Sequence, residues 1–403
     1  MLNSRSVVLQ VLKVAFVVAI FAYLLASGKL DIGQFEVAAI QWDLFLVSIA
    51  LVATTMLLLM IRYWYVVRSN QIPLNLSEAF RIGFVAFFFT NCAFGALSGE
   101  IVRMTYTAPY AEKKSRVLNA ILFDRFIGVL SLSTLSLIGL AFNRSLIHAP
   151  WFFIATGAIF LFSSFAWQAL ISICSLSYLG HKWGVLTSYA FMVVIAASGF
   201  LLFAGDDGLL SHHWGRYVGI AMLLSFLVYV PILLAMIRRV KNSPDWQIEA
   251  PVNRWRLLVA RVESVLHSCM QFVSRFKVLA IALGMALIAH FLYVLALLFI
   301  GMALAGNMGF HVAQGLLAAP MTFLMNLFPF PGAGAGVNEA SYGFFMETLA
   351  GVDITTAVSS YFFFRCILIL LSLVGAPLFV LRGKNSSQLA AKIAMSNGGD
   401  ECE

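Results

Sequence analysis

Long apolar runs constrain this chain more than any other feature of its sequence. A helix needs about 20 predominantly apolar residues to cross the hydrocarbon core of a bilayer. Eight runs meet this length, and they cover residues 7–27, 44–67, 117–142, 151–179, 185–204, 217–237, 278–304 and 355–381. We therefore expect an all-α polytopic membrane protein with about eight transmembrane helices.

The composition excludes a soluble protein. Apolar residues make up 61% of the chain and charged residues 11%, whereas a soluble domain carries about 25% charged residues. So few charges cannot cover a water-facing surface, which excludes soluble enzymes and nucleic-acid-binding proteins. The first run has no A-x-A cleavage site, so we interpret it as a retained anchor. We expect one membrane domain over residues 1–383 and a short cytoplasmic tail at 384–403.

Lys and Arg predict the orientation of the chain. They gather in alternate loops, including 238–277, whereas the stretch 305–354 contains neither residue type. Because basic loops stay on the cytoplasmic side, we expect both termini in the cytoplasm of a bacterial inner membrane. Within the basic loop, residues 253–277 place apolar side chains at helical spacing between basic ones. This pattern is typical of an amphipathic helix lying on the cytoplasmic leaflet.

Two further apolar segments do not fit the alternation of cytoplasmic and outer loops if they are counted as full crossings. Segment 79–99 has basic clusters before and after it, so a crossing would place one cluster outside the cell. Segment 312–349 is interrupted by FPFPGAGAG, whose Pro329 and Pro331 cannot continue a helix. We predict that both are re-entrant helical hairpins that enter from opposite faces. Non-helical backbone at membrane depth needs surrounding protein or water, so each hairpin indicates a cavity.

The two hairpins carry polar residues in the same order. In each, an Asn leads through a Gly-rich stretch to a Glu, and an Arg follows in a long apolar run 25 or 26 residues after the Glu. The two sets are Asn91, Glu100 and Arg125 in the first half and Asn326, Glu339 and Arg365 in the second. This order predicts an inverted repeat, which in many transporters places the substrate site between the repeats.

Charges at membrane depth identify candidate binding residues. Arg365 lies near the centre of the last run, where a lone Arg costs about 2.5–3.5 kcal/mol. It therefore needs a partner, for which Glu339 is the best candidate and Glu100 the second. Arg103 and Arg125 flank the first hairpin, and guanidinium groups match phosphate oxygens. Backbone N–H groups of the Gly-rich turns would add donors. The alternative is that Glu339 and Arg365 only fix the helix packing.

His290 is a candidate proton relay in the middle of the run 278–304. The alternative is a hydrogen-bonded packing residue. No nucleotide-binding, metal-binding or catalytic motif is visible in the sequence, so we expect neither a cofactor nor a metal.

Four strings resemble the lysylphosphatidylglycerol-synthase transmembrane family, also called flippase-like, and the resemblance covers roughly residues 11–383. They are GALSGEIVRM, LFDRFIGVLSL, FPFPGAGAGVNEASYGFF and YFFFRCILILLSLVGAP. The family's G-E-x-x-R element falls on Gly99, Glu100 and Arg103, and its Arg-led helix falls on Arg125. Its second Gly-rich element falls on Gly334, Gly336 and Glu339, and its closing Arg falls on Arg365. The resemblance thus adds Gly334 and Gly336 to the expected substrate-binding residues.

The resemblance also implies a lipid-related function. In the best-known relatives, this membrane domain is fused to a soluble aminoacyl transferase and moves the modified phospholipid across the bilayer. Archaeal relatives are linked to dolichol-phosphate sugar pathways. Only residues 382–403 follow the last run, so we expect no aminoacyl transferase domain and no lipid aminoacylation.

We therefore expect translocation of a lipid with an anionic, phosphate-bearing head group, either a polyprenyl-phosphate-linked sugar or a phospholipid. Its partners would be that lipid, the membrane, and a glycosyltransferase or lipid-modifying enzyme, with no nucleic acid. Two alternatives stay open: a membrane-embedded glycosyl- or phosphoryl-transferase, and a non-catalytic accessory subunit of a glycan or lipid pathway. The enzyme would need Glu100 and Glu339 close together as acid and base, whereas pairing of each Glu with an Arg favours binding or gating.

Overall fold

The computed structural model describes residues 40–94, 96–143, 160, 163–174, 180–203, 229–235, 237, 276–305, 310–325 and 334–381. Within these ranges the regular elements are helices and no strand occurs, which confirms the all-α prediction. Several expected features lie wholly or mostly outside the described residues: the runs at 7–27, 151–179 and 217–237, the amphipathic segment 253–277, the residues Asn326, Pro329 and Pro331, and the tail at 384–403.

Four helices in the described ranges are long and apolar enough to cross a membrane. They are α2 (Trp42–Ser69), α5 (Lys114–Phe142), α10 (Phe276–Ala305) and α13 (Ile354–Ser372), which continues after a turn to Leu381. The first residue of each helix lies within about three residues of the start of one of the predicted apolar runs. A further helix, α7 (Gly180–Phe203), covers most of another run. A helix satisfies its own backbone polar groups, which is what an apolar solvent requires of any segment that crosses it.

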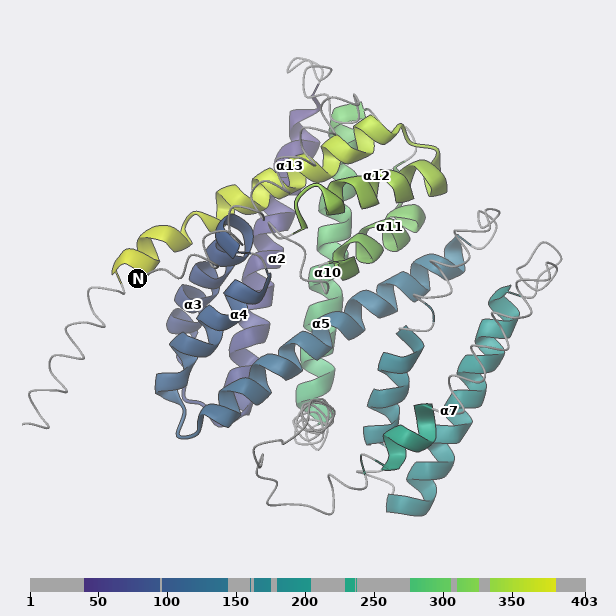
Figure 1. Cartoon of the computed structure of the whole chain (residues 1–403). Coiled ribbons are helices and arrows are strands. Elements are labelled where there is room, and N and C mark those ends of the chain that lie inside the picture. Colours follow the sequence, from purple (N-terminus) through teal and green to yellow (C-terminus); the bar gives the residue numbers. More distant parts are fainter. Residues whose placement is uncertain are drawn as a thin grey trace, which may run out of the picture.

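The helices α2 and α10 run antiparallel through the centre of the molecule (Figure 1). The N–H of Gln41, just before α2, donates to the carbonyl of Ala303 near the end of α10 at 3.1 Å. Both helices pass through two separate hydrophobic clusters. The first-half core contains the C-terminal part of α2, α3 and the start of α10. The second-half core contains the N-terminal part of α2, the end of α10, and α11 to α13.

Two pairs of short helices pack at opposite ends of these long helices (Figure 1). The first pair is α3 (Leu76–Phe88) and α4 (Ala96–Thr107), joined by the π-helix η2 (Phe89–Phe94). The second pair is α11 (Val312–Leu324) and α12 (Val337–Ala350). The members of each pair contact one another. The first pair adjoins the first-half core and the second pair adjoins the second-half core.

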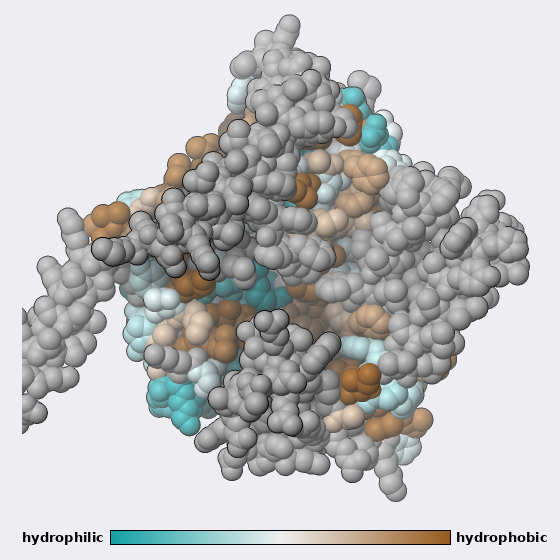
Figure 2. Space-filling view, viewed as in Figure 1, coloured by the Kyte–Doolittle hydropathy of each residue, from teal (hydrophilic) through white to brown (hydrophobic). Residues whose placement is uncertain are grey.

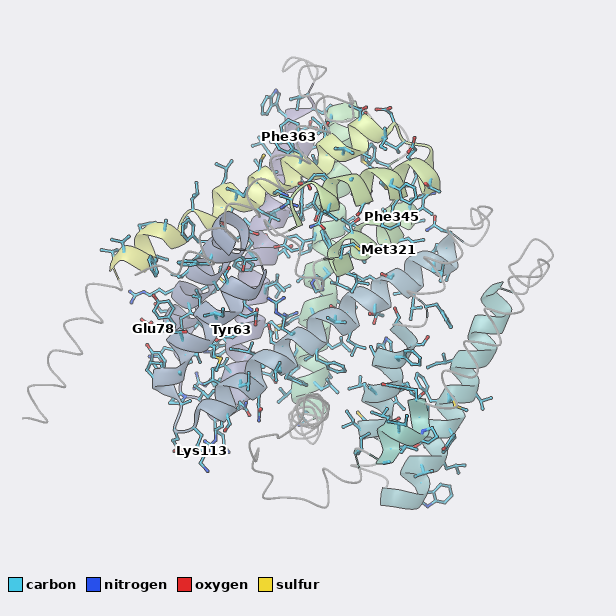
Figure 3. All side chains as sticks on the ribbon, in the orientation of Figure 1. Tyr63, Glu78, Lys113, Met321, Phe345 and Phe363 are labelled. Carbon is cyan, nitrogen blue, oxygen red and sulfur yellow. The ribbon has the colours of Figure 1, made fainter. Side chains whose placement is uncertain are left out.

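The chain thus repeats one order of elements. A long helix, two short helices in mutual contact and another long helix occur as α2–α3–α4–α5 and again as α10–α11–α12–α13. Figure 3 shows Tyr63 within the first group and Met321 and Phe345 close together within the second.

The outer surface of α13 is apolar. Figure 2 shows hydrophobic residues along this helix, where Leu370, Val380 and Leu381 are each at least 59% exposed. Such a surface is stable in a lipid environment, in agreement with the membrane assignment.

The helix α5 packs against α11 with backbone contact at Gly139. A Cβ atom at this position would lie 2.5 Å from backbone atoms of Leu316 and Leu317. We predict that Gly139→Ala destabilises the protein by about 1–3 kcal/mol, the usual cost of overpacking, and lowers its thermal midpoint in detergent.

Gly284→Ala is the matched control, because no atom lies within 4 Å of the corresponding Cβ position on α10. Ala is a better helix former than Gly, so this variant keeps or raises the midpoint. Equal midpoints for the two variants would show that the α5–α11 contact is not as close as described.

Candidate functional site

The first of two ion-pair networks connects α4 with α5. Glu100 on α4 accepts a hydrogen bond at Oε1 from Arg125 Nη2 on α5. Arg103 follows Glu100 by one turn, and its Nη1 lies 3.8 Å from Glu100 Oε1 and 3.4 Å from Asp124 Oδ2. The three predicted residues of the first half that carry charge therefore do come together.

Asp124 extends this network to α2 through a residue that the sequence analysis missed. Arg62 donates from Nε to Asp124 Oδ1 at 2.8 Å and from Nη2 to Oδ2 at 3.0 Å. The two side chains are 7% and 3% exposed. Neither Arg62 nor Asp124 was among the candidate site residues predicted from the sequence. The signal was available, because a carboxylate inside an apolar run needs a cationic partner.

Aromatic rings hold Arg103 in place. Its guanidinium carbon lies 4.9 Å from the ring centroid of Tyr63 on α2 and 5.7 Å from that of Phe87 on α3, within the range of a cation–π interaction. The hydroxyl of Tyr63 is hydrogen-bonded to Thr107 Oγ1 at 2.6 Å. Figure 3 shows Tyr63 beside the α3–α4 pair. Arg103 is thus fixed by contacts from three helices.

The first network has more positive than negative charge. Three arginines, Arg62, Arg103 and Arg125, face two acids, Glu100 and Asp124, which leaves a formal charge of +1. Three buried polar atoms of this network have no hydrogen-bond partner among the described residues: Arg62 Nη1, Arg103 Nε and Glu100 Oε2. Two of them are donors. Since buried polar groups are normally satisfied, the arrangement suits an anion with several acceptor oxygens.

The second network joins α12 to α13 and is neutral. Arg365 donates from Nε to Glu339 Oε1 at 2.5 Å and from Nη2 to Oε2 at 3.2 Å. The Glu339 side chain is fully buried, and that of Arg365 is 15% exposed. The predicted pairing of these two residues is confirmed. The sequence left two arrangements open for the two acids: Glu100 and Glu339 close together, or each acid paired with an Arg. In the structure each Glu pairs with an Arg of its own half of the chain.

Two glycines build the turn that precedes α12. Gly334 and Gly336 have φ values of +72° and +81°, in the left-handed region that Gly adopts without steric cost. The carbonyl of Gly334 accepts from Arg365 Nη2 at 3.2 Å, and the N–H of Gly336 donates to Glu339 Oε2 at 2.7 Å. The Gly336 N–H is therefore already used within the protein. The expectation of a donor for phosphate at this position is wrong in the described conformation.

Two other predicted residues, His290 and Asn91, take no part in the ion pairs and hydrogen bonds described above. His290 on α10 is hydrogen-bonded through Nδ1 to Ser131 Oγ on α5 at 2.6 Å, as expected for the packing alternative, and its relay role stays a prediction. Asn91 lies in the π-helix η2, an irregularity that is frequent at functional sites. Its proposed partner in the repeat, Asn326, is outside the described residues.

The apolar helices and the buried charges together define a membrane protein with a polar site inside its helix bundle. Residues 10–183 match the family described as the lysylphosphatidylglycerol synthase TM region. This match supports membership of that membrane family and suggests a membrane lipid-related function. It confirms the resemblance for the part of the chain that holds GALSGEIVRM and LFDRFIGVLSL. The matched range includes the first network and ends before the second. Searches of the curated proteins and of the solved structures gave no match.

The buried pair between Arg62 and Asp124 should contribute strongly to stability. We predict that Asp124→Asn destabilises the protein by about 3–5 kcal/mol, because it leaves a buried guanidinium without its counter-charge. The measurement is the thermal midpoint of the purified protein in detergent.

Glu112→Gln provides the control for this prediction. Glu112 pairs with Arg116 at 3.2 Å, but its side chain is 79% exposed, and exposed pairs contribute only about 0.2–1 kcal/mol. If Asp124→Asn shifts the midpoint no more than Glu112→Gln does, the Arg62–Asp124 pair is not buried as described.

Proposed function

We propose that this protein translocates a lipid with an anionic, phosphate-bearing head group across the membrane. The observation that carries the proposal is the excess positive charge of the first network, together with its two buried donors, Arg62 Nη1 and Arg103 Nε, that lack partners among the described residues. A phosphate would supply both the missing charge and the acceptor oxygens. The family match supports a lipid as the carrier of that phosphate. The candidate substrates are a polyprenyl-phosphate-linked sugar and a phospholipid.

Arg125 is the residue that would meet the phosphate first. Its side chain is 47% exposed, whereas those of Arg103 and Glu100 are 12% and 17% exposed. In the empty site Glu100 pairs with Arg125 and limits the cost of an isolated charge. An arriving phosphate would replace Glu100 at Arg125 and draw on the unused donor of Arg103. Glu100 Oε2 would then accept a hydrogen bond from a hydroxyl of the head group.

The repeated order of helices supplies a means of movement. Antiparallel α2 and α10, and short-helix pairs at opposite ends, support an inverted repeat with re-entrant hairpins at α3–α4 and α11–α12. In the full chain we propose about eight crossings, with both termini in the cytoplasm of a bacterial inner membrane. Rocking of one repeat against the other would expose the site to each leaflet in turn. If a glycosyltransferase or lipid-modifying enzyme consumed the lipid on one side of the membrane, net transport would run toward that side.

Reconstitution in vesicles tests the function directly. The purified protein is placed in liposomes with fluorescent phosphatidylglycerol in one leaflet, and both its transbilayer exchange and its mass are followed. Faster exchange at unchanged mass is the expected result. A new lipid species would contradict translocation in favour of the membrane enzyme. If exchange is not accelerated and no new lipid species forms, the result would favour an accessory subunit.

Substitutions in the two networks should slow this exchange. We predict that Arg125→Gln lowers the rate at least about 10-fold, since a charge-assisted hydrogen bond contributes about 1.5–3 kcal/mol. Glu339→Ala and Arg365→Ala should abolish exchange while the protein still inserts, because each removes one half of the second pair.

Arg116→Gln is the control on the same helix, because Arg116 pairs only weakly with the exposed Glu112 near the start of α5. It should keep the wild-type rate. Wild-type exchange in Arg125→Gln, Glu339→Ala and Arg365→Ala alike would remove the assignment of these residues to the substrate site.

A further inference from the structure

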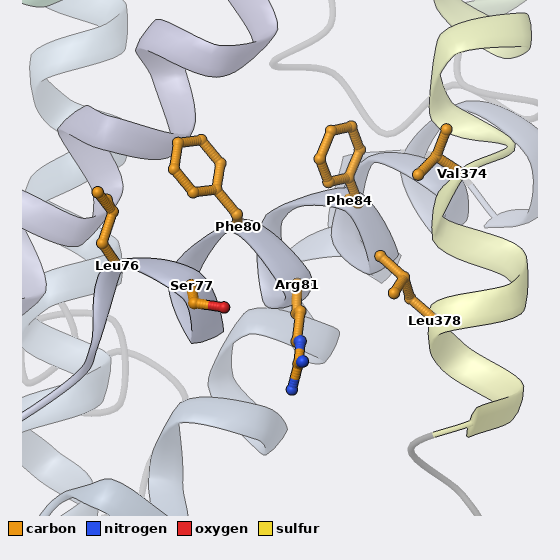
Figure 4. Close-up of a pocket in the computed structure, with 7 residues that line it drawn as sticks. All are labelled: Leu76, Ser77, Phe80, Arg81, Phe84, Val374 and Leu378. Carbon is orange, nitrogen blue, oxygen red and sulfur yellow. The ribbon is translucent and has the colours of Figure 1, made fainter.

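An open groove lies between α3 and the part of α13 that follows its turn. Its volume is about 450 Å³, within the range of about 300–1,000 Å³ for ligand clefts. Its lining, shown in Figure 4, consists of Leu76, Ser77, Phe80, Arg81, Phe84, Val374 and Leu378. One wall therefore comes from the first repeat of helices and the other wall from the end of the second.

Close packing fixes the two walls of the groove relative to one another. Gly375 approaches α3 so closely that a Cβ atom would lie 2.2 Å from the carbonyl oxygen of Phe84. The rings of Phe89 and Phe379 are in contact beside it, with centroids 5.1 Å apart. The groove is therefore held in shape by backbone and ring contacts between α3, η2 and the end of α13.

The lining separates into an apolar wall and a cationic edge. Figure 4 shows the rings of Phe80 and Phe84 on one side of α3 and the side chain of Arg81 extending away from them. The Arg81 side chain is 59% exposed, and its Nη1 lies 2.9 Å from Glu78 Oε1. An exposed pair of this kind contributes little, about 0.2–1 kcal/mol, so a phosphate can compete with Glu78 for the guanidinium.

The groove also lies next to the first network. On α3, Phe80 and Phe84 line the groove, while Phe87, nearly one turn further along, contacts the guanidinium of Arg103. Phe80, Phe84 and Phe87 recur at helical spacing and so lie on one face of α3. The groove and the guanidinium of Arg103 are therefore connected along this row of rings.

We propose that the groove holds one acyl chain of an anionic phospholipid whose head-group phosphate binds Arg81. This inference rests on the proposed function and deepens it, because it names the path of the lipid tail. The chain stays in the apolar groove while the phosphate transfers from Arg81 to Arg125 and Arg103 of the first network. The charge of Arg81 makes the groove selective for anionic over zwitterionic phospholipids.

Photochemical labelling tests the groove in the full chain. A diazirine-bearing amino acid replaces Leu378, and the protein is placed in vesicles of phosphatidylglycerol and phosphatidylcholine in equal amounts. After illumination, mass spectrometry identifies the adducts. We expect phosphatidylglycerol adducts to exceed phosphatidylcholine adducts, and Arg81→Gln to lower this ratio about fivefold, the order of effect of one Arg near a membrane surface.

The same diazirine in place of Leu370 gives the matched control, because Leu370 is 65% exposed on α13 and does not line the groove. It should label the two lipids in proportion to the vesicle composition. Three results at position 378 would overturn the proposal. They are a ratio of phosphatidylglycerol to phosphatidylcholine adducts equal to that at position 370, an adduct with a peptide from residues 1–39, and a cross-linked dimer.

Exchange of fluorescent phosphatidylglycerol in the same vesicles separates this proposal from the proposed function. Enriched labelling without exchange would contradict translocation and keep the groove as a lipid-binding site. Exchange without enriched labelling would contradict the groove and keep translocation.

Discussion

Buried charge must be balanced where water is scarce, and this requirement determines which helices lie side by side. Arg62 reaches Asp124 from α2 to α5, Arg125 reaches Glu100 from α5 to α4, and Arg365 reaches Glu339 from α13 to α12. Each pair joins two different helices. Removal of one partner from a buried pair is far more costly than removal of both. The pairs therefore act as fixed points around which the apolar side chains pack.

The two repeats share an order of helices but differ in charge. The second network is neutral, and its acid also accepts from the backbone N–H of Gly336. The first network has an excess of one positive charge and includes donors for which the described residues offer no acceptor. This difference leads us to place phosphate binding in the first half. In our account the second pair stays closed while the first site is loaded, and it separates when the repeats rock.

The sequence predicted the features that depend on length and on local charge. The long helices match the apolar runs because the thickness of the bilayer sets both, and the Glu–Arg pairs follow from a spacing that recurs in each half. The sequence did not predict the Arg62–Asp124 pair, since nothing local shows that α2 packs beside α5 at that level. It also could not show that the Gly336 N–H is used by Glu339, because this bond depends on the turn geometry.

The central claim is that the first network binds the phosphate of a lipid. The most direct measurement is a cryo-electron microscopy map of the full chain in nanodiscs that contain phosphatidylglycerol. Our account predicts phosphate density within hydrogen-bond distance of Arg125 or Arg103, with Glu100 moved away from Arg125. It would be contradicted by a map in which Arg125 keeps its bond to Glu100 and lipid phosphates occur only at the membrane surface.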